Sequence, residues 1–499
     1  MKLKVRDMEI ETGGVLVAIL NEEEAKALDL YHGDRIIIRK GKKEAVAIVD
    51  IAENQHVVRN GVIGLFGETM NALDLKKGDS VHIDLQERPK SVHFIKKKLD
   101  GEKLSKEEIY SVVDDIVNNK LTDVELAYFV GAYYVHESND KETVWLTKAI
   151  VEHGKKLKMG KKIIIDKHCS GGVPGNRTTM ILVPILAAAG LTIPKTSSRS
   201  ITSPAGTADT MEVLAPVKHS IEKIKKIVKK TDGCIVWGGA VDLASADDKL
   251  IRIRYPLFLD PEGMLLASIL AKKAAVNSTH VLIDIPIGRE TKIKTVKDAL
   301  HLKRKFIKIG KLLGMKIKII LTKGNQPIGN GIGPCLEAKD VLYILRRDKR
   351  RPLDLEKKAV MMAGKIMEMV GIKDSQEKAQ QILDSGRAYK KMKEIIKAQG
   401  GNPNIAPEDI QIGKYSYDYL APARGILKDI DNITVNKVAR VAGAPKDKEA
   451  GLYLYKHEGD SVKKGEKLFT IYSKSSVKLK YALNILKKVG EIRIDERYY

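Results

Sequence analysis

The feature that most constrains the fold is an alternation of short apolar segments with helical segments between residues 161 and 240. Short apolar runs bounded by glycine or polar residues are typical of buried strands, and three occur here: "KIIIDKH", "GLTIPKTSS" and "GCIVWGG". The segments between them, "TTMILVPILAAAG" and "SIEKIKKIVKK", have the length and the apolar spacing of helices. Such alternation predicts an α/β lobe with a mostly parallel sheet.

Helical sequence flanks this region on both sides. Residues 92–160 contain two capping-box patterns, Ser105 with Glu108 and Thr122 with Glu125, each of which indicates a helix start. The α/β pattern returns at "HVLIDIPIG" and "KIKIILTKG" after a further helical stretch. We therefore predict two lobes interleaved in sequence. The helical lobe comprises 92–160 and 240–278, and the α/β lobe comprises 161–239 and 279–410.

The two ends of the chain indicate separate domains. "ALDLYHGDRIIIR" (27–39) is repeated 45 residues later as "ALDLKKGDSVHID" (72–84), and in each copy a Gly-Asp turn precedes an alternating strand. Residues 1–88 are thus expected to form a small pseudo-symmetric β-barrel. Residues 412–499 combine strands with glycine turns and predict a C-terminal α+β domain, so the chain is a multidomain α/β protein.

The composition narrows the class of protein. The formal net charge is +24, and two interpretations stay open: nucleic-acid binding, or a lysine-rich surface with some positive charge directed at a small anionic substrate. Aromatic residues make up only 5%, which disfavours a base-stacking surface. Charged residues reach 30%, with abundant Lys, Ile and Glu, as is typical of thermophiles.

The N-terminal segment "MKLKVRDMEIETGG" lacks an apolar signal, and no apolar run is long enough to span a membrane. We therefore expect a cytoplasmic protein without a membrane partner. The three cysteines, Cys169, Cys234 and Cys335, are too few and too scattered for a disulfide framework or a zinc site. No metal and no cofactor is predicted.

Two loops carry the chemistry. "DKHCSGGVPGNRTT" (166–179) follows a strand with small, donor-rich residues, which let backbone N–H groups converge on an anion. The spacing is not that of a nucleotide P-loop, and a tight strand–helix turn is the alternative. "KTSSRSITSPAGTADTMEV" (195–213) repeats the pattern after the next strand, with helix capping as its alternative. Neighbouring strand ends would bring the two loops together as a phosphate site.

These loops and the later "LLASILAKK" resemble the motifs of the pyrimidine and thymidine nucleoside phosphorylase family. The resemblance covers about 92–499 and implies the two-lobed fold that this family shares with phosphoribosyltransferases. The N-terminal repeat is absent from ordinary members, and with it the chain resembles an archaeal branch that acts on nucleotides. The implied reaction is AMP plus phosphate to adenine plus ribose 1,5-bisphosphate, with CMP and UMP as further candidates. The resemblance also implies a homo-oligomer, dimer or larger, and no requirement for a metal. No nucleic-acid partner is expected, because a mere scaffold would not need so many converging donors in its loops.

The resemblance assigns candidate roles to individual residues. The attacking phosphate would contact Lys167, Cys169, Ser197 and Thr207, with Thr179 nearby and Gly172 allowing close backbone approach. This chain has Ser-Ile-Thr-Ser at 200–203 where the pyrimidine enzymes have Gly, Leu, Gly and His, Cys169 where they usually have serine, and an additional Pro174. The added hydroxyls suggest a second, 5′-phosphate site. The substrate-binding candidates of this loop are Ser198, Arg199, Ser200, Ile201, Thr202 and Ser203, and the sequence does not place the 5′-phosphate on a particular one of them.

A purine base departs more readily when it is protonated, which requires a general acid. Asp260, in "YPLFLDPEG", is the candidate that the resemblance favours, whereas the residues alone favour a helix cap. Ser268 and Lys272 would contact the base, and His168 would line the substrate site. Lys292 is either a further contact or a solvated lysine.

Three other interpretations fit parts of the sequence. A thymidine or uridine phosphorylase would share every motif but gain nothing from a 5′-phosphate. A nucleic-acid-binding protein on this scaffold would bind RNA in a salt-dependent manner. Anthranilate phosphoribosyltransferases share the general architecture, but they would need magnesium and a GTGGD-type loop, which this sequence lacks.

Overall fold

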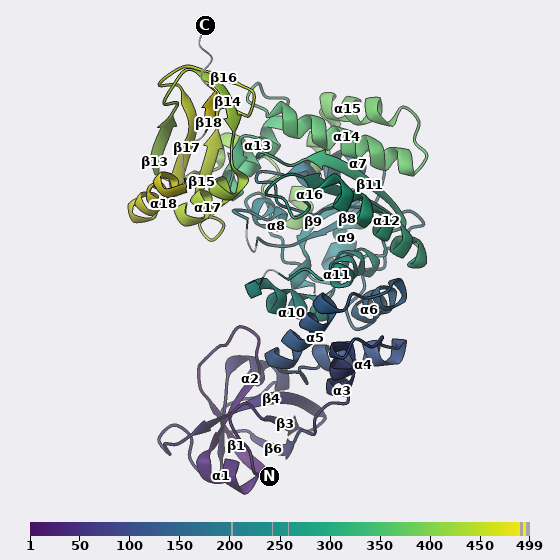
Figure 1. The fold of residues 1–499 in the computed structure, drawn as a ribbon, viewed down its shortest axis with the longest axis vertical. Helices are drawn as coiled ribbons and strands as arrows, with labels where there is room; N and C mark the ends of the chain where they lie inside the picture. The colour runs from purple at the N-terminus through teal and green to yellow at the C-terminus, as the bar shows by residue number, and fades with distance from the viewer. Residues whose placement is uncertain (201–202, 242, 258, 490–492, 496–499) are drawn as a thin grey trace. The chain divides into compact units, whose positions relative to one another are not determined.

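The computed structural model describes residues 1–499 except 201–202, 242, 258, 490–492 and 496–499 (Figure 1). The chain forms two compact units, which are described separately. Unit 1 comprises 1–153 and 245–267, and unit 2 comprises 154–244 and 268–499. The predicted substrate residues Ile201 and Thr202 lie outside the described residues.

The N-terminal repeat folds into a closed six-stranded barrel with the strand order β1-β5-β2-β4-β3-β6, which confirms the predicted barrel. The two copies match in detail. Asp29 and Asp74 both have left-handed backbones, with φ of 53° and 52°, and Gly33 and Gly78 both have φ of 88°. The elements are β1 (Lys2–Asp7), β2 (Val17–Asn21), α1 (Glu22–Ala27), β3 (Arg35–Lys40), β4 (Lys43–Ala52), β5 (Val62–Leu65), α2 (Gly67–Leu73) and β6 (Ser80–Leu85).

Helices make up the rest of unit 1. Both predicted capping boxes are present, at Ser105 and at Thr122, and a third begins at Asn139. The buried Phe129 and Tyr133 pack edge to face between the helices. The helices are α3 (Ser91–Leu99), α4 (Lys106–Val117), α5 (Asp123–Val135), α6 (Asp140–Glu152), α10 (Ser245–Arg254) and η2 (Tyr255–Leu257). Helix α11 (Glu262–Ala275) begins in unit 1 and ends in unit 2.

Unit 2 contains the predicted α/β lobe. The parallel strands β7 (Ile165–Cys169), β10 (His280–Ile287) and β11 (Lys316–Lys323) form one sheet, and the parallel strands β8 (Ile193–Ser197) and β9 (Gly233–Trp237) form another. The Ile165 N–H donates to Thr192 O at 3.0 Å, so β7 begins beside β8. Asp166 of β7 also pairs with Lys195 of β8 at 3.3 Å, so the two strands advance side by side and the loops that follow them leave at the same edge.

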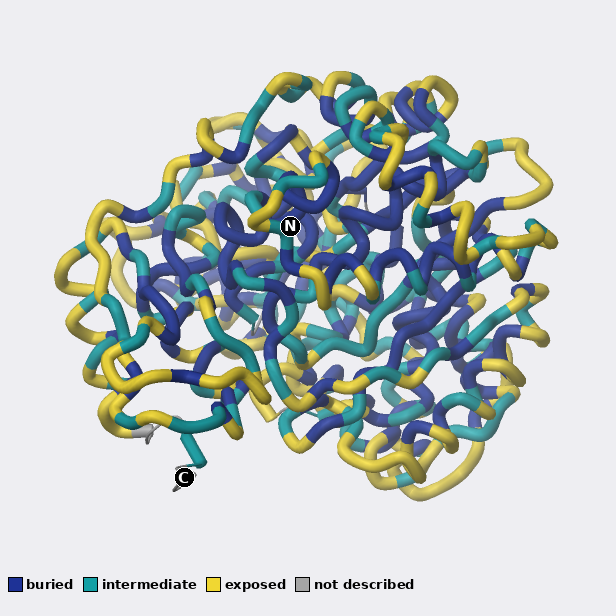
Figure 2. The backbone as a smooth tube through the Cα atoms, turned by 90° about the horizontal axis from the view of Figure 1, so that it is seen from above, coloured by how far each residue is buried: buried dark blue, intermediate teal, exposed yellow. Residues whose placement is uncertain are grey.

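Helices cover these sheets, and α7 (Thr178–Ala188) is almost entirely buried. It belongs to a hydrophobic core that also includes residues of α13 (Pro334–Leu345), α14 (Leu353–Met369) and α16 (Arg387–Gln399). Figure 2 shows buried backbone in dark blue inside exposed yellow turns. The remaining helices of the lobe are α8 (Thr207–Met211), α9 (Ile221–Thr231), η1 (Gly238–Ala240), α12 (Val296–Leu312), α15 (Ser375–Asp384) and η3 (Pro407–Asp409).

The C-terminal part of unit 2 is an α+β domain, as predicted. Strand β12 (Gly331–Ile332), from the α/β lobe, joins the first of its two sheets, β12-β15-β17-β13, and the second sheet is β16-β14-β18. Its elements are β13 (Tyr415–Leu420), β14 (Gly425–Asp429), α17 (Asn432–Ala442), β15 (Gly451–Leu454), β16 (Ser461–Val462), β17 (Lys467–Ser473), α18 (Ser476–Val489) and β18 (Arg493–Asp495).

Candidate phosphate and nucleotide site

The loop after β7 is organised by a buried lysine. Lys167 is 2% exposed, and its Nζ donates to Thr178 Oγ1 at 3.0 Å. The Thr178 hydroxyl donates in turn to Asn176 Oδ1 at 3.0 Å, and Asn176 Nδ2 lies 3.5 Å from Cys169 Sγ. Lys167 thus reaches across the loop to the first residue of α7. Burial lowers the pKa of Lys167 from its ordinary value, and a bound anion would oppose that effect.

Gly172 is the position where this loop requires glycine. Its φ is +94°, and a Cβ there would lie 2.8 Å from Thr291 Cα and 3.3 Å from the Lys292 backbone nitrogen. A side chain would therefore force apart two backbone segments, because neither contact involves a flexible group. The loop after β7 is held against the loop that follows β10.

Beneath the loop, buried lysines outnumber buried carboxylates. Asp166 pairs with Lys195 at 3.3 Å and with Lys273 at 2.8 Å, and Asp284 pairs with Lys358 at 3.0 Å. Including Lys167, this cluster holds four lysines against two aspartates. Burial lowers the pKa of Lys195 to about 7, with Lys273 and Lys167 adding to the effect and Asp166 opposing it. An excess of buried positive charge favours an anionic ligand.

The loop after β8 has no such excess of cations: Asp209 and Glu212 face Arg199 and Lys448, which pairs with Glu212 at 2.8 Å. The Arg199 guanidinium donates to Glu212 at 2.6 and 2.8 Å and to Asp209 at 3.0 Å, and it lies 4.9 Å from the centre of the Trp237 ring. Arg199 holds the pKa of Glu212 down to about 2. The positive charge of Arg199 is therefore already balanced by two carboxylates of its own loop and helix.

Asp209 also shapes this loop through its second oxygen. Its Oδ2 accepts the N–H groups of Ser200 at 2.7 Å and Gly206 at 2.9 Å. The Ser200 hydroxyl donates to the Ser203 carbonyl, and the Ser203 hydroxyl donates to Ala205 O at 3.0 Å. These bonds fold the loop back on itself and fix the predicted 5′-phosphate hydroxyls.

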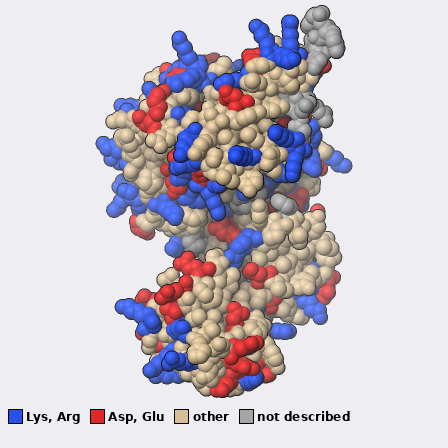
Figure 3. Space-filling view, turned by 90° about the vertical axis from the view of Figure 1, so that its left-hand side faces the viewer, with Lys and Arg blue, Asp and Glu red and all other residues tan. Residues whose placement is uncertain are grey.

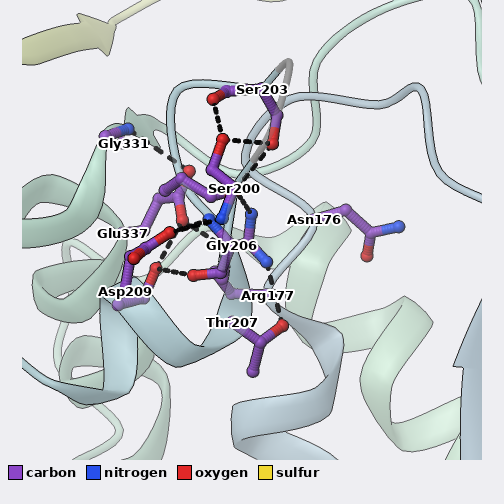
Figure 4. Close-up of polar contacts among 12 residues, drawn as sticks. Asn176, Arg177, Ser200, Ser203, Gly206, Thr207, Asp209, Gly331 and Glu337 are labelled. Carbon is purple, nitrogen blue, oxygen red and sulfur yellow. Dashed lines mark hydrogen bonds and ion pairs between the residues drawn. The ribbon is translucent and has the colours of Figure 1, made fainter. Parts of the chain in front are cut away.

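The two loops are joined by Arg177, the residue before α7. Arg177 Nη1 donates to Thr207 Oγ1 at 3.0 Å, Nη2 donates to Ala205 O at 2.6 Å, and Nε donates to Glu337 (Figure 4). Arg177 thus holds the two loops against each other, and Thr207 is the predicted site residue that it contacts.

The other predicted residues lie as follows. Thr179 and Ser268 are buried, whereas Lys292 is exposed apart from its backbone contact with Gly172. Burial, reinforced by the lysines Lys273 and Lys195, lowers the pKa of His168 well below its ordinary value, so its ring is neutral at neutral pH. Ser197 ends β8, the Ser198 carbonyl accepts the Ala208 N–H at 3.4 Å, and Lys272 lies on α11.

Asp260 belongs to unit 1, two residues before α11 begins. Its Oδ1 is 3.6 Å from Nη1 of the buried Arg254, and its side chain is 39% exposed. Its role stays a prediction, as do the ligand roles of the loop residues.

Several residues of this arrangement were not predicted from the sequence. Arg177, Lys195 and Lys273 all lie inside the quoted motifs but received no role, so treating every cation of those motifs as a candidate would have found them. Asp284, Glu337 and Lys358 carry no local signal, since each is far in sequence from its partner.

Among the residues that the structure describes, no group of His, Cys, Asp and Glu could hold a metal ion. Within the same residues, no helix is both long and apolar enough to cross a membrane. On the face shown in Figure 3, Lys and Arg are spread over the surface and interspersed with Asp and Glu. On this face, the basic residues do not gather into one patch.

Three family models match the chain. The glycosyl transferase family helical bundle domain matches 92–154, the glycosyl transferase family a/b domain matches 161–389, and the pyrimidine nucleoside phosphorylase C-terminal domain matches 426–493.

Relatives match over nearly the whole length. The AMP phosphorylase of Thermococcus sibiricus is 45% identical, covering 99% of this chain and 98% of the relative. The AMP phosphorylase of Thermofilum pendens is also 45% identical, covering 97% of this chain and 94% of the relative. That of Methanococcus vannielii is 44% identical, covering 97% of this chain and 95% of the relative.

Solved structures of anthranilate phosphoribosyltransferase share the fold. The enzyme from Thermus thermophilus superimposes with a TM-score of 0.51 at 16% identity, covering 61% of this chain and 98% of that one. The Saccharomyces cerevisiae enzyme, solved with PRPP and Mg, also gives 0.51, at 15% identity, covering 63% and 98%. At such identities the likeness concerns the fold alone.

Proposed function

The chain belongs to the family of the AMP phosphorylases, and we propose on that premise that it converts AMP and phosphate to adenine and ribose 1,5-bisphosphate. CMP and UMP are further candidate substrates. The observation that carries this proposal is the unbalanced set of buried lysines beneath the β7 loop, because both substrates carry phosphate. We also propose that it works in the cytoplasm as a homo-oligomer.

The reaction needs orientation more than covalent chemistry. An oxygen of inorganic phosphate attacks C1′ of the ribose, the bond from C1′ to the base nitrogen breaks, and its electron pair leaves with the base. A proton delivered to the base neutralises the departing charge. The transition state resembles an oxocarbenium ion, so the enzyme acts by holding the phosphate and the ribose in line.

The two loops have different tasks in this proposal. Lys167, Cys169, Ser197 and Thr207 hold the attacking phosphate, with Thr179 nearby and the Gly172 backbone in close approach. The hydroxyls of Ser198, Ser200 and Ser203 serve the 5′-phosphate, and those of Ser200 and Ser203 must then turn from Ser203 O and Ala205 O to the ligand. Arg199, already paired with Asp209 and Glu212, shapes their loop.

Residues outside the loops serve the base. Asp260 donates the proton, and Ser268, Lys272 and Lys292 contact the base. His168 lines the substrate site as a neutral ring, able to form hydrogen bonds without adding charge.

The experiment is phosphate-dependent release of free base from AMP, adenosine and thymidine, with wild type and Asp260→Asn side by side. We expect AMP to be the best substrate and Asp260→Asn to lose at least about a hundredfold in kcat, the usual scale of general acid catalysis. Asp123→Asn is a matched control, because Asp123 also lies at a helix start in unit 1, 3.9 Å from an arginine, Arg252.

Faster cleavage of thymidine than of AMP would refute the nucleotide assignment and identify a pyrimidine nucleoside phosphorylase. Full activity of Asp260→Asn would refute the proton donor alone. Salt-dependent RNA binding without any release of base would indicate the nucleic-acid alternative.

A further inference from the structure

Arg177 lies in a phosphate loop, yet its guanidinium is committed to protein groups. It is 8% exposed, and Nε, Nη1 and Nη2 each donate to a different partner: Glu337, Thr207 and Ala205 O. Figure 4 shows these contacts together, while the Asn176 amide points away from them. Two of the partners flank Gly206 in the second loop, so Arg177 spans the gap between the loops.

Glu337 is the centre of this arrangement. It is 1% exposed on α13, and besides Arg177 its Oε2 accepts the Thr210 hydroxyl at 2.8 Å. Its Oε1 accepts the Gly333 N–H at 3.2 Å. One buried carboxylate thus fixes the β7 loop through Arg177, helix α8 through Thr210, and the turn that enters α13. It also balances the charge of Arg177, which leaves the excess lysines as the cations for the substrates.

The bond from Arg177 to Thr207 determines what the Thr207 hydroxyl can do. A guanidinium has only donors, so the Thr207 oxygen must accept from it. The hydroxyl proton of Thr207 is then available to donate elsewhere. A phosphate oxygen is an acceptor, so this is the polarity that a phosphate ligand needs.

We propose that Arg177 and Glu337 are positioning residues for the attacking phosphate: together they place the Thr207 hydroxyl and orient it as a donor. This role rests on the proposed phosphorolysis. It predicts that disturbing the pair weakens phosphate binding more than AMP binding, because Thr207 is itself a proposed phosphate ligand. The 5′-phosphate candidates are reached only indirectly, through Ala205 O, which accepts from both Arg177 and the Ser203 hydroxyl.

The test compares Glu337→Gln and Arg177→Lys with wild type, measuring KM for phosphate, KM for AMP, kcat and the melting temperature. Glutamine keeps the shape but loses the charge, and lysine cannot reach all three partners of Arg177 at once. We expect each variant to raise KM for phosphate on the order of tenfold, the scale of one hydrogen bond to a charged group, with KM for AMP little changed. Adding either change to a Thr207→Val enzyme should raise KM for phosphate no further.

Glu356→Gln is the matched control. Glu356 is a buried carboxylate on α14, paired with Arg347 at 2.7 Å and Arg351 at 2.9 Å, and none of these contacts involves either loop. The same substitution there should lower the melting temperature and leave KM for phosphate unchanged.

The proposal is overturned if Glu337→Gln lowers only the melting temperature, as expected for the Glu356→Gln control. It is also overturned if Glu337→Gln and Thr207→Val together raise KM for phosphate by the product of their separate effects. If Glu337→Gln does not fold, the same measurements on Arg177→Lys decide. A wild-type enzyme without phosphate-dependent release of base would refute the proposed function itself, whereas an active wild type with insensitive variants would refute only the positioning role.

Discussion

The loops after β7 and β8 have similar compositions, each combining hydroxyls, glycine and a cation, but they differ in how the cations are paired. Lys167 of the β7 loop bonds to a threonine hydroxyl, above a cluster in which lysines outnumber carboxylates. Arg199 of the β8 loop is paired with two carboxylates. The comparison teaches that a cation in a candidate phosphate loop is available to a ligand only when the carboxylates around it do not already balance its charge.

The sharpest test of this comparison is Lys167→Met. Removing a buried cation that lies where phosphate is proposed to bind should reduce kcat/KM for phosphate by roughly a hundredfold to a thousandfold, the scale for one preorganised donor. Steady-state kinetics with varied phosphate measure it. Lys318→Met, a lysine of β11 paired with Glu368, is the control and should stay near wild type. A Lys167→Met enzyme with near-normal phosphate kinetics would contradict the assignment.

Arg199→Met should have a smaller effect of a different kind. The change leaves Asp209 and Glu212 without their arginine, so we expect the protein to lose about 1–3 kcal/mol of stability. Activity should fall only about tenfold or less, because the loop becomes less rigid but loses no residue that contacts the substrate. Thermal melting and kinetics on the same preparation measure both. If activity falls as far as in Lys167→Met while melting is unchanged, Arg199 is a direct ligand and the comparison fails.

The remaining test concerns pH. Asp340 on α13 accepts the N–H groups of Asn330 and Gly331, both at 2.7 Å. The segment 328–331 also contacts the β7 loop, because the Ile328 N–H donates to Pro174 O. Burial raises the pKa of Asp340 from 3.8 to about 7. Between these values the folded protein keeps a proton that the unfolded chain releases. The contribution of this group to the free energy of unfolding is therefore complete below about pH 4. It is lost as the pH rises to about 7, and the total loss is at most roughly 4 kcal/mol.

The melting temperature of Asp340→Asn should fall less between pH 5 and pH 8 than that of wild type, because the amide cannot titrate. Glu212, the partner of Arg199 in the β8 loop, behaves differently. Its pKa is held to about 2, so it stays ionised throughout this pH range. Equal losses in wild type and Asp340→Asn would show that the β7 loop has no titrating anchor.

Local patterns in the sequence predicted the architecture well. The capping boxes at Ser105 and Thr122, the repeat and the parallel strands each depend on residues close in sequence, and the structure confirms them. The charge pairing could not be predicted in this way. Arg177 and Glu337 are 160 residues apart, and nothing near Arg199 distinguishes a substrate ligand from the partner of Asp209 and Glu212.

The strand order of the barrel has a consequence for its origin and its folding. The first copy of the repeat supplies β1, β2 and β3, and the second supplies β4, β5 and β6; around the barrel the copies alternate without exception. Every strand pair therefore joins one copy to the other, and a single copy has no sheet of its own. An ancestral gene encoding one copy would have needed two chains to close the barrel, and duplication with fusion would have made that association permanent. In the present chain the barrel can close only after the second copy has been synthesised. Most of its paired strands lie far apart in sequence, which favours slow folding.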